Sequence, residues 1–181
     1  MIAVRFCGPC LLCIKAYSIE LYELPSFLYE TKNEVGIQVL REPTATYWFR
    51  TNMFRQVSMS DYTESGDSGS IRILLLDDSS GMYLYEVQTT PSFNVILVGQ
   101  YLKRWKESFV RELALGTSGR RGVWIERRRS DMQQIVTAFN APDDSDESTI
   151  FSEQGPKSIT TSVILETKSY DLRGNFFFTY P

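Results

Sequence analysis

The chain has 181 residues, of which 43% are hydrophobic and 23% charged, and its formal net charge is −3 at pH 7. This length and composition suit a globular protein with its own hydrophobic core. The acidic balance argues against a general affinity for nucleic acid, because nucleic-acid-binding domains usually carry a basic excess. No apolar stretch approaches the roughly 20 residues that span a bilayer, and no signal peptide is recognisable. We expect an intracellular protein, cytoplasmic or nuclear, without a nucleic-acid or membrane partner.

The chain contains no histidine. Ser-His-Asp and Cys-His catalysis and histidine-ligated zinc are therefore excluded within this chain. The segment GDSG at residues 66–69 resembles the nucleophile motif of chymotrypsin-like proteases. Without a histidine base, we expect only a flexible turn there. The chain is expected to be non-enzymatic, with no catalytic residue, no cofactor and no metal site.

Three cysteines, Cys7, Cys10 and Cys13, lie near the N-terminus. The segment FCGPC resembles the active-site motif of thioredoxins, which implies Cys7 as nucleophile, Cys10 as resolving thiol and Pro43 as the facing cis-proline. Only six residues precede Cys7, too few for the strand and helix that a thioredoxin places upstream. We expect small apolar cysteines on or beside a buried strand. A thiol-disulfide oxidoreductase remains the alternative function.

Short β-like segments follow one another along most of the chain, with turn residues between them. Strands are predicted, in chain order, at residues 11–14, 18–24, 35–40, 44–49, 71–76, 82–87, 93–98, 109–115, 122–127, 134–139, 159–166 and 170–180. The segment DDSSG between 71–76 and 82–87 suits a reversal, so these two strands are expected to form an antiparallel hairpin. Residues 47–49, Tyr-Trp-Phe, are apolar on both faces, which predicts a position inside a sheet.

The second arm of that hairpin alternates, which predicts two different faces. One face would carry Met82, Leu84 and Glu86, and the other Tyr83, Tyr85 and Val87.

Residues 101–113 have two interpretations. Leu102, Trp105, Phe109 and Leu113 recur at three- and four-residue spacing, which fits an amphipathic helix. The alternation over 109–115 instead supports two strands with a turn near 106–108, and we favour the strands.

Many short strands with few helical candidates indicate an all-β sandwich, barrel or propeller. The stretch LALGTSGRRGVWIERRRSDMQQIVTAF, residues 113–139, ends one strand and adds two more around Gly/Ser/Arg turns. This order is that of the first three strands of a WD-type propeller blade, although the Trp-Asp and Gly-His pairs are missing. We predict an antiparallel, β-propeller-like fold: a single β-rich domain over 1–181, or a partial propeller of roughly four blades.

Three segments resemble the C-terminal, propeller-like region of F-box proteins of mushroom-forming fungi: LLCIKAYSIELYELP, LALGTSGRRGVWIERRRSDM and SYDLRG. The resemblance implies a non-enzymatic protein-interaction scaffold, the substrate-recognition part of an SCF-type ubiquitin ligase, with a protein partner. We see no F-box, the helical Leu/Pro-rich segment that would precede the strands. The chain is therefore expected to be a fragment or a truncated paralogue.

Candidate binding residues cluster around the strand at 122–127, because Arg and Trp are over-represented at binding hot spots. They are Arg120, Arg121, Trp124, Arg127, Arg128 and Arg129. The alternative is that Trp124, between Val123 and Ile125, packs in the core and that the arginines form a solvated turn.

Overall fold

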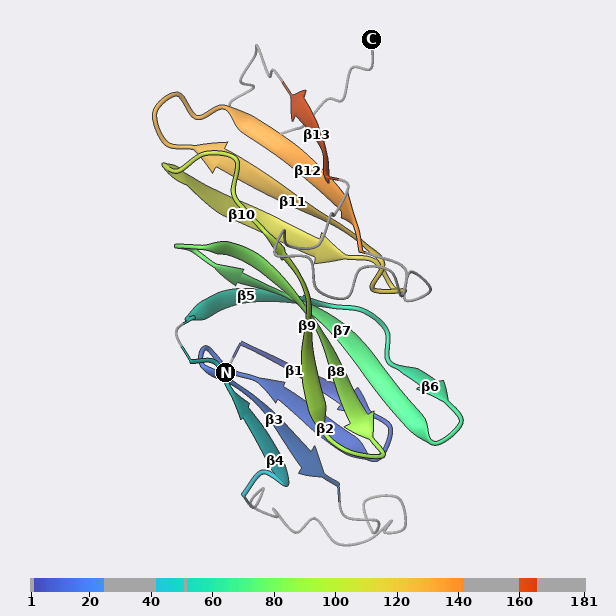
Figure 1. The fold of residues 1–181 in the computed structure, drawn as a ribbon. Helices are drawn as coiled ribbons and strands as arrows, with labels where there is room; N and C mark the ends of the chain where they lie inside the picture. Colours follow the sequence, from blue (N-terminus) through green and yellow to red (C-terminus); the bar gives the residue numbers. More distant parts are fainter. Residues whose placement is uncertain (1, 25–41, 51, 142–159, 166–181) are drawn as a thin grey trace, which may run out of the picture.

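The computed structural model describes residues 2–24, 42–50, 52–141 and the strand at 160–165. This part of the chain is all-β and antiparallel, with thirteen strands in three sheets and no helix (Figure 1). The all-β prediction is confirmed. No helix long and apolar enough to cross a membrane occurs in the described residues. The predicted strands at 35–40 and 170–180 lie outside them.

The first and third sheets pair only strands that follow one another along the chain, and the middle sheet departs from this order at one position. The first sheet has the order β1 (Ala3–Cys7), β2 (Cys10–Ile14), β3 (Ser18–Glu23), β4 (Ala45–Trp48). The middle sheet has the order β5 (Phe54–Met59), β7 (Ser68–Asp77), β8 (Gly81–Thr90), β9 (Asn94–Tyr101), with β6 (Thr63–Ser65) also paired to β7. The third sheet has the order β10 (Ser108–Leu115), β11 (Arg121–Arg128), β12 (Gln134–Asn140), β13 (Thr160–Leu165).

Two local predictions are confirmed and one is wrong. The hairpin over 71–76 and 82–87 is β7–β8, with Leu76 opposite Met82, and 101–113 holds the end of β9 and the start of β10 instead of a helix. The prediction that Tyr-Trp-Phe lies inside a sheet is wrong for Trp48 and for the position of β4, although Phe49, just after the strand, is buried in a hydrophobic core. Among the described strands β4 pairs only with β3, and Trp48 is 65% exposed, because an edge strand at the end of a stack can leave one face to solvent.

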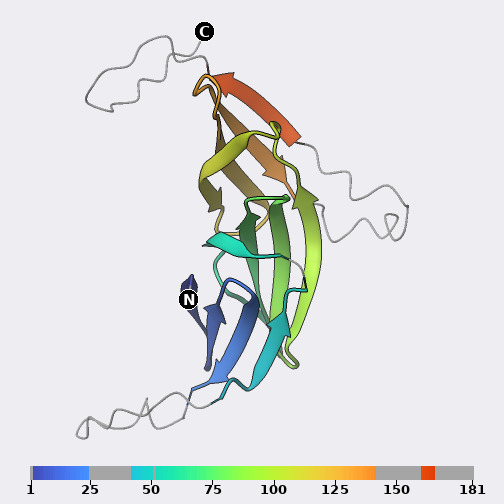
Figure 2. The same ribbon diagram turned by 90° about the vertical axis from the view of Figure 1, so that its left-hand side faces the viewer.

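The middle sheet lies between the other two, and Figure 2 shows the three layers from the side. Its β7 and β8 are buried on both faces because their apolar residues alternate between two cores. The first core, shared with the first sheet, includes Ile71, Ile73, Leu75, Tyr83, Tyr85 and Val87. The second core, shared with the third sheet, includes Leu74, Leu76, Met82 and Leu84. The predicted alternation of β8 thus lets one strand contribute side chains to both cores.

Backbone contacts hold the third sheet against the middle one. Leu115 N–H donates to Ser58 Oγ at 2.8 Å, and Asp61 N–H donates to the carbonyl of Thr117 at 2.8 Å. Gly119, in the turn between β10 and β11, has φ +70° and lies on the side chain of Arg72, where an added Cβ would be 2.7 Å from the Arg72 Cβ. The β10–β11 turn therefore docks on the middle sheet, and glycine permits both its backbone conformation and its close approach.

Candidate interaction cleft

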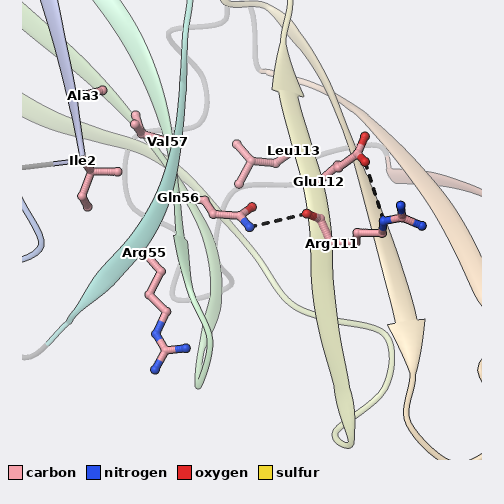
Figure 3. A pocket seen from close by; sticks show the side chains of 8 residues that line it. All are labelled: Ile2, Ala3, Arg55, Gln56, Val57, Arg111, Glu112 and Leu113. Atoms are coloured by element: carbon pink, nitrogen blue, oxygen red, sulfur yellow. Dashed lines mark hydrogen bonds and ion pairs between the residues drawn. The ribbon is translucent and has the colours of Figure 1, made fainter.

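The first strands of the three sheets, β1, β5 and β10, approach one another and border an open, shallow cleft of about 450 Å³ (Figure 3). Three short runs line it: Ile2 and Ala3; Arg55, Gln56 and Val57; Arg111, Glu112 and Leu113. We call this site the first-strand cleft. Each sheet contributes one short run of residues to the site, so its shape depends on how the three sheets stack.

Both arginines of the first-strand cleft occur at irregularities in their strands. The pairing of β5 with β7 shifts register between Phe54 and Gln56, and that of β10 with β11 shifts between Val110 and Glu112. Arg55 and Arg111 are thus the residues left out of the ladder. A β-bulge re-aims a side chain and bends its strand, and bulges are frequent beside functional sites. Two consecutive sheets therefore each have an arginine at a bulge in the strand that borders this cleft.

The lining of the first-strand cleft is mixed, with four apolar and four polar or charged residues. In Figure 3, Gln56 points across from β5 to β10, where its Nε2 donates to the carbonyl of Arg111 at 3.4 Å. Leu113 points toward β5, whereas the side chains of Arg111 and Glu112 point to the far side of β10. Such a cleft can take apolar side chains of a partner between the strands and polar groups at its edge.

Charged contacts fix the rim. Arg55 forms an ion pair with Asp78 at 2.9 Å, and Arg111 lies 3.7 Å from the carboxylate of its neighbour Glu112. All four side chains are well exposed. Ion pairs of this kind contribute little to stability, so the rim charges can be exchanged for contacts with a partner at small cost.

The sequence did not predict any residue of this cleft as a binding residue. A signal was present: the segments FRQVSM of β5 and VRELAL of β10 share an apolar-Arg-polar-apolar start. The likeness becomes visible only when β5 is known to be a strand. Its mixture of polar and apolar residues has no clear period, and it was not predicted.

The predicted arginines do not form one cluster. Arg120 and Arg121 lie at the start of β11, and Arg127, Arg128 and Arg129 at its end. The six residue-to-residue steps from 121 to 127 span about 20 Å in an extended strand. Arg120, Arg121 and Arg129 are exposed, as a solvated turn requires. The five arginines are close in the sequence, but the length of the extended strand places them in two separate groups.

Arg128 is held in place by its neighbours. Its Nε donates to Asp131 at 2.9 Å, its Nη2 donates to Gln133 at 2.7 Å, and its guanidinium lies 5.0 Å from the ring centroid of Trp105. The guanidinium holds the pKa of the Asp131 carboxyl below its ordinary value. These contacts close the turn between β11 and β12, so Arg128 has a structural role.

Trp124 is a core residue. It is 2% exposed and packs in the second core with Tyr101 and Phe139, its ring centroid lying 5.9 Å from that of Phe139. Its indole N–H has no hydrogen-bond partner among the described residues, and neither has Nε of Arg127. Trp124 is therefore not available on the surface for a partner to contact. Its position agrees with the alternative that it packs in the core.

The CGPC segment forms a β-hairpin turn instead of the start of a helix. Cys7 and Cys10 lie opposite each other at the end of β1 and β2, with Gly8 at φ +56° and Pro9 between them. All three thiols are free and buried. Burial raises the pKa of the Cys7 thiol from 9.0 to about 11, with a smaller opposing effect from Arg5. Burial likewise raises the pKa of Cys10 and of Cys13. A redox nucleophile has the opposite property, a lowered pKa and an accessible sulfur.

We expect all three thiols of the native protein to react slowly with an aromatic disulfide reagent near neutral pH, and to react promptly in denaturant. The reaction of Cys7 should accelerate as the pH rises toward about 11, where its thiolate forms. Because the folded pKa exceeds the unfolded one, stability is fully present below pH 9.0 and falls as the pH rises through about 11. A rapidly reacting thiol at neutral pH would contradict this and would revive the oxidoreductase alternative.

No group of three or more His, Cys, Asp or Glu side chains that could hold a metal ion occurs in the part of the chain that the structure describes. The first-strand cleft is the hollow that the structure shows between the three sheets in these residues. No family model, no curated protein and no solved structure matches the chain.

Proposed function

We propose that this chain is a non-enzymatic protein-interaction scaffold, which binds an extended segment of a partner protein in the first-strand cleft. The observation that carries the proposal is the repeated bulge: Arg55 and Arg111 occupy the same irregular position in the first strands of two consecutive sheets. The two arginines lie on the strands that border a cleft of mixed polar and apolar lining, which suits a partner with apolar and acidic side chains.

The same proposal includes the propeller-like arrangement. Consecutive antiparallel sheets, each paired in chain order and stacked face to face with the first strands together, are the plan of adjacent propeller blades. A ring would have further blades beyond the three described sheets. In propellers the first strands line the central channel, which is the place that the first-strand cleft would occupy.

The resemblance to fungal F-box proteins would make the partner a substrate of a ubiquitin ligase. This extension is independent of the cleft. The test is to determine the coding sequence upstream of this chain: an F-box there supports the extension, and a transit signal or a βαβ unit there contradicts it.

The thiol-disulfide oxidoreductase is less well supported than the scaffold. The described residues around Cys7 and Cys10 form a hairpin, the sulfurs are buried, and their pKa values are raised. Each of these three properties lowers the thiolate reactivity on which such an enzyme depends.

The cleft is tested by selecting binders from a displayed library of random peptides on the whole chain. We expect the selected peptides to bind Arg111→Glu about tenfold more weakly than the unmodified chain, since a reversed rim charge repels an acidic partner residue. Arg55→Glu should have an effect in the same direction. Binding is measured by fluorescence anisotropy with one selected peptide.

The matched control is Arg129→Glu, which makes the same charge change at an exposed position outside the cleft. It should leave the affinity unchanged. Equal weakening by Arg111→Glu and Arg129→Glu would indicate a nonspecific charge effect. Selected peptides that bind all three variants alike would place recognition elsewhere and would contradict the proposal.

A further inference from the structure

The turn between β11 and β12 presents a serine directly after three arginines. Ser130 is exposed in this turn, and the arginines occupy residues 127–129. The turn between β10 and β11 offers a comparison within the same sheet. Ser118 is also exposed there, but its nearest arginines, at residues 120–121, follow it instead of preceding it. The basic run before the hydroxyl therefore distinguishes Ser130 from Ser118.

The guanidinium of Arg128 already binds an anion beside Ser130. Its Nε donates to the carboxylate of Asp131 at 2.9 Å, and Asp131 is the residue that follows Ser130. A phosphate on Ser130 would carry up to two negative charges and three strong acceptor oxygens at the same turn. Hydrogen bonds from arginine to phosphate are charge-assisted and are often bidentate, so the phosphate would compete with Asp131 for this guanidinium.

The conformation of the turn depends on Arg128. Met132 has φ +63°, in the left-handed region that residues other than glycine rarely adopt. Its N–H donates to the carbonyl of Arg128 at 3.1 Å, and the Arg128 side chain donates to Asp131 and Gln133. An unfavourable backbone conformation persists only where the surrounding contacts hold it. A group that takes the guanidinium from Asp131 would therefore change this turn.

We propose that Ser130 is a phosphorylation site, for a protein kinase with an acidic peptide groove, and that Arg128 holds the phosphate formed there. In the transfer, the Oγ of Ser130 attacks the γ-phosphorus of ATP and the bond from that phosphorus to the oxygen of the leaving ADP breaks. The hydroxyl proton passes to the carboxylate base of the kinase. The three cations before the hydroxyl would face the groove, since complementary charge governs which partners a surface accepts.

The turn is separate from the first-strand cleft. None of the residues from 128 to 134 lines that cleft. The phosphorylation site is therefore independent of the proposed function, and each can be tested without the other.

The site is tested by incubating the whole chain with ATP and the catalytic subunit of protein kinase A, whose peptide groove is acidic, and mapping the phosphate by mass spectrometry. We expect phosphate on Ser130 and none on Ser118. Ser130→Ala, an exposed substitution that should leave the fold intact, should abolish the incorporation.

A matched pair of variants tests whether the basic run is what the kinase recognises. Arg127→Gln removes a cation three residues before Ser130, and Arg121→Gln makes the same change at the other end of β11. We expect kcat/KM for phosphorylation to fall at least about tenfold in Arg127→Gln and to stay unchanged in Arg121→Gln. Circular dichroism and thermal unfolding establish that both variants fold.

Phosphorus NMR tests whether Arg128 holds the phosphate. A nearby guanidinium favours the doubly charged form, so the second pKa of the Ser130 phosphate should be lower in the folded chain than in the chain unfolded by urea. Arg128→Gln, phosphorylated to completion with more kinase, should lose this difference. A purely structural role of Arg128 would leave the phosphate pKa the same in the folded and unfolded chains, and would overturn its assignment.

Two results would overturn the site itself. One is equal incorporation at Ser130 and Ser118, because exposure alone would then explain the reaction. The other is phosphorylation of a synthetic peptide of residues 122–136 but not of the folded chain, because the folded turn would then exclude the kinase. Peptide binding at the first-strand cleft is measured separately, so a failure of the phosphorylation site leaves the proposed function standing, and the reverse.

Discussion

Replacing Glu126 with alanine is expected to lower the free energy of unfolding by about 3 kcal/mol. Glu126 in β11 is fully buried, and its carboxylate accepts hydrogen bonds from the backbone N–H groups of Arg104 and Trp105 and from the hydroxyl of Ser108. These donors belong to the connection between β9 and β10, which joins the middle and third sheets. Without the carboxylate the two part-buried backbone N–H groups would lose their acceptor, at a desolvation cost for each, while Ser108 Oγ would keep its hydrogen bond to the carbonyl of Trp105 at 2.7 Å.

The glutamine variant separates hydrogen bonding from packing. Oε1 accepts from Trp105 and Ser108, whereas Oε2 accepts from Arg104. In Glu126→Gln the amide oxygen can keep the first two bonds, but the NH₂ group faces the third donor. We expect the free energy of unfolding to fall by about 1 to 2 kcal/mol, so the glutamine variant should be less stable than the unmodified chain and more stable than the alanine variant.

Urea denaturation measures all three proteins, with Glu112→Ala as the control at an exposed position of β10. The control should change stability by no more than about 0.5 kcal/mol. An alanine variant as stable as the control would mean that water replaces the carboxylate as acceptor, and that the connection is not held as described.

Replacing Leu74 or Leu75 with alanine is expected to lower the free energy of unfolding by about 2 to 5 kcal/mol in each case. Both side chains are fully buried and are neighbours in β7, but Leu74 belongs to the second core and Leu75 to the first. The same substitution at adjacent positions should therefore loosen different parts of the molecule. The reason is that successive side chains of a strand point to opposite faces.

Native-state amide exchange identifies the part that is loosened. Leu74→Ala should speed exchange first in β11 and β12, and Leu75→Ala first in β2 and β3. Leu102→Ala, at an exposed position, should change stability by no more than about 0.5 kcal/mol. If both core variants speed exchange equally in the first and third sheets, the two cores do not behave as separate units.

Both results bear on the first-strand cleft, because it has walls from all three sheets. Loosening either core moves one wall relative to the others. Variants of Leu74 and Leu75 are therefore expected to weaken peptide binding without touching the cleft, in contrast to Arg111→Glu, which should weaken binding without changing stability.

Much of the local structure was determined by the sequence. The alternation of β8 and the turn residues between β7 and β8 are short-range patterns, and they predict the hairpin and its two faces. The strands at 109–115, 122–127 and 134–139 follow from the same reasoning. The all-β class followed from their number. Local patterning suffices here because neighbours in the chain are also neighbours in each sheet.

The site was decided only by the tertiary structure. β1 contains arginine, and β5 contains arginine and glutamine, among apolar residues. Neither strand has an alternation of polar and apolar residues clear enough to predict it from the sequence. Residues 2, 57 and 113 come together because three sheets stack, a contact between distant segments that no local pattern encodes. For the same reason Trp48 is exposed and Trp124 is buried, although both stand among apolar neighbours. What a strand's face meets is set by the next sheet, and that information is not in the strand.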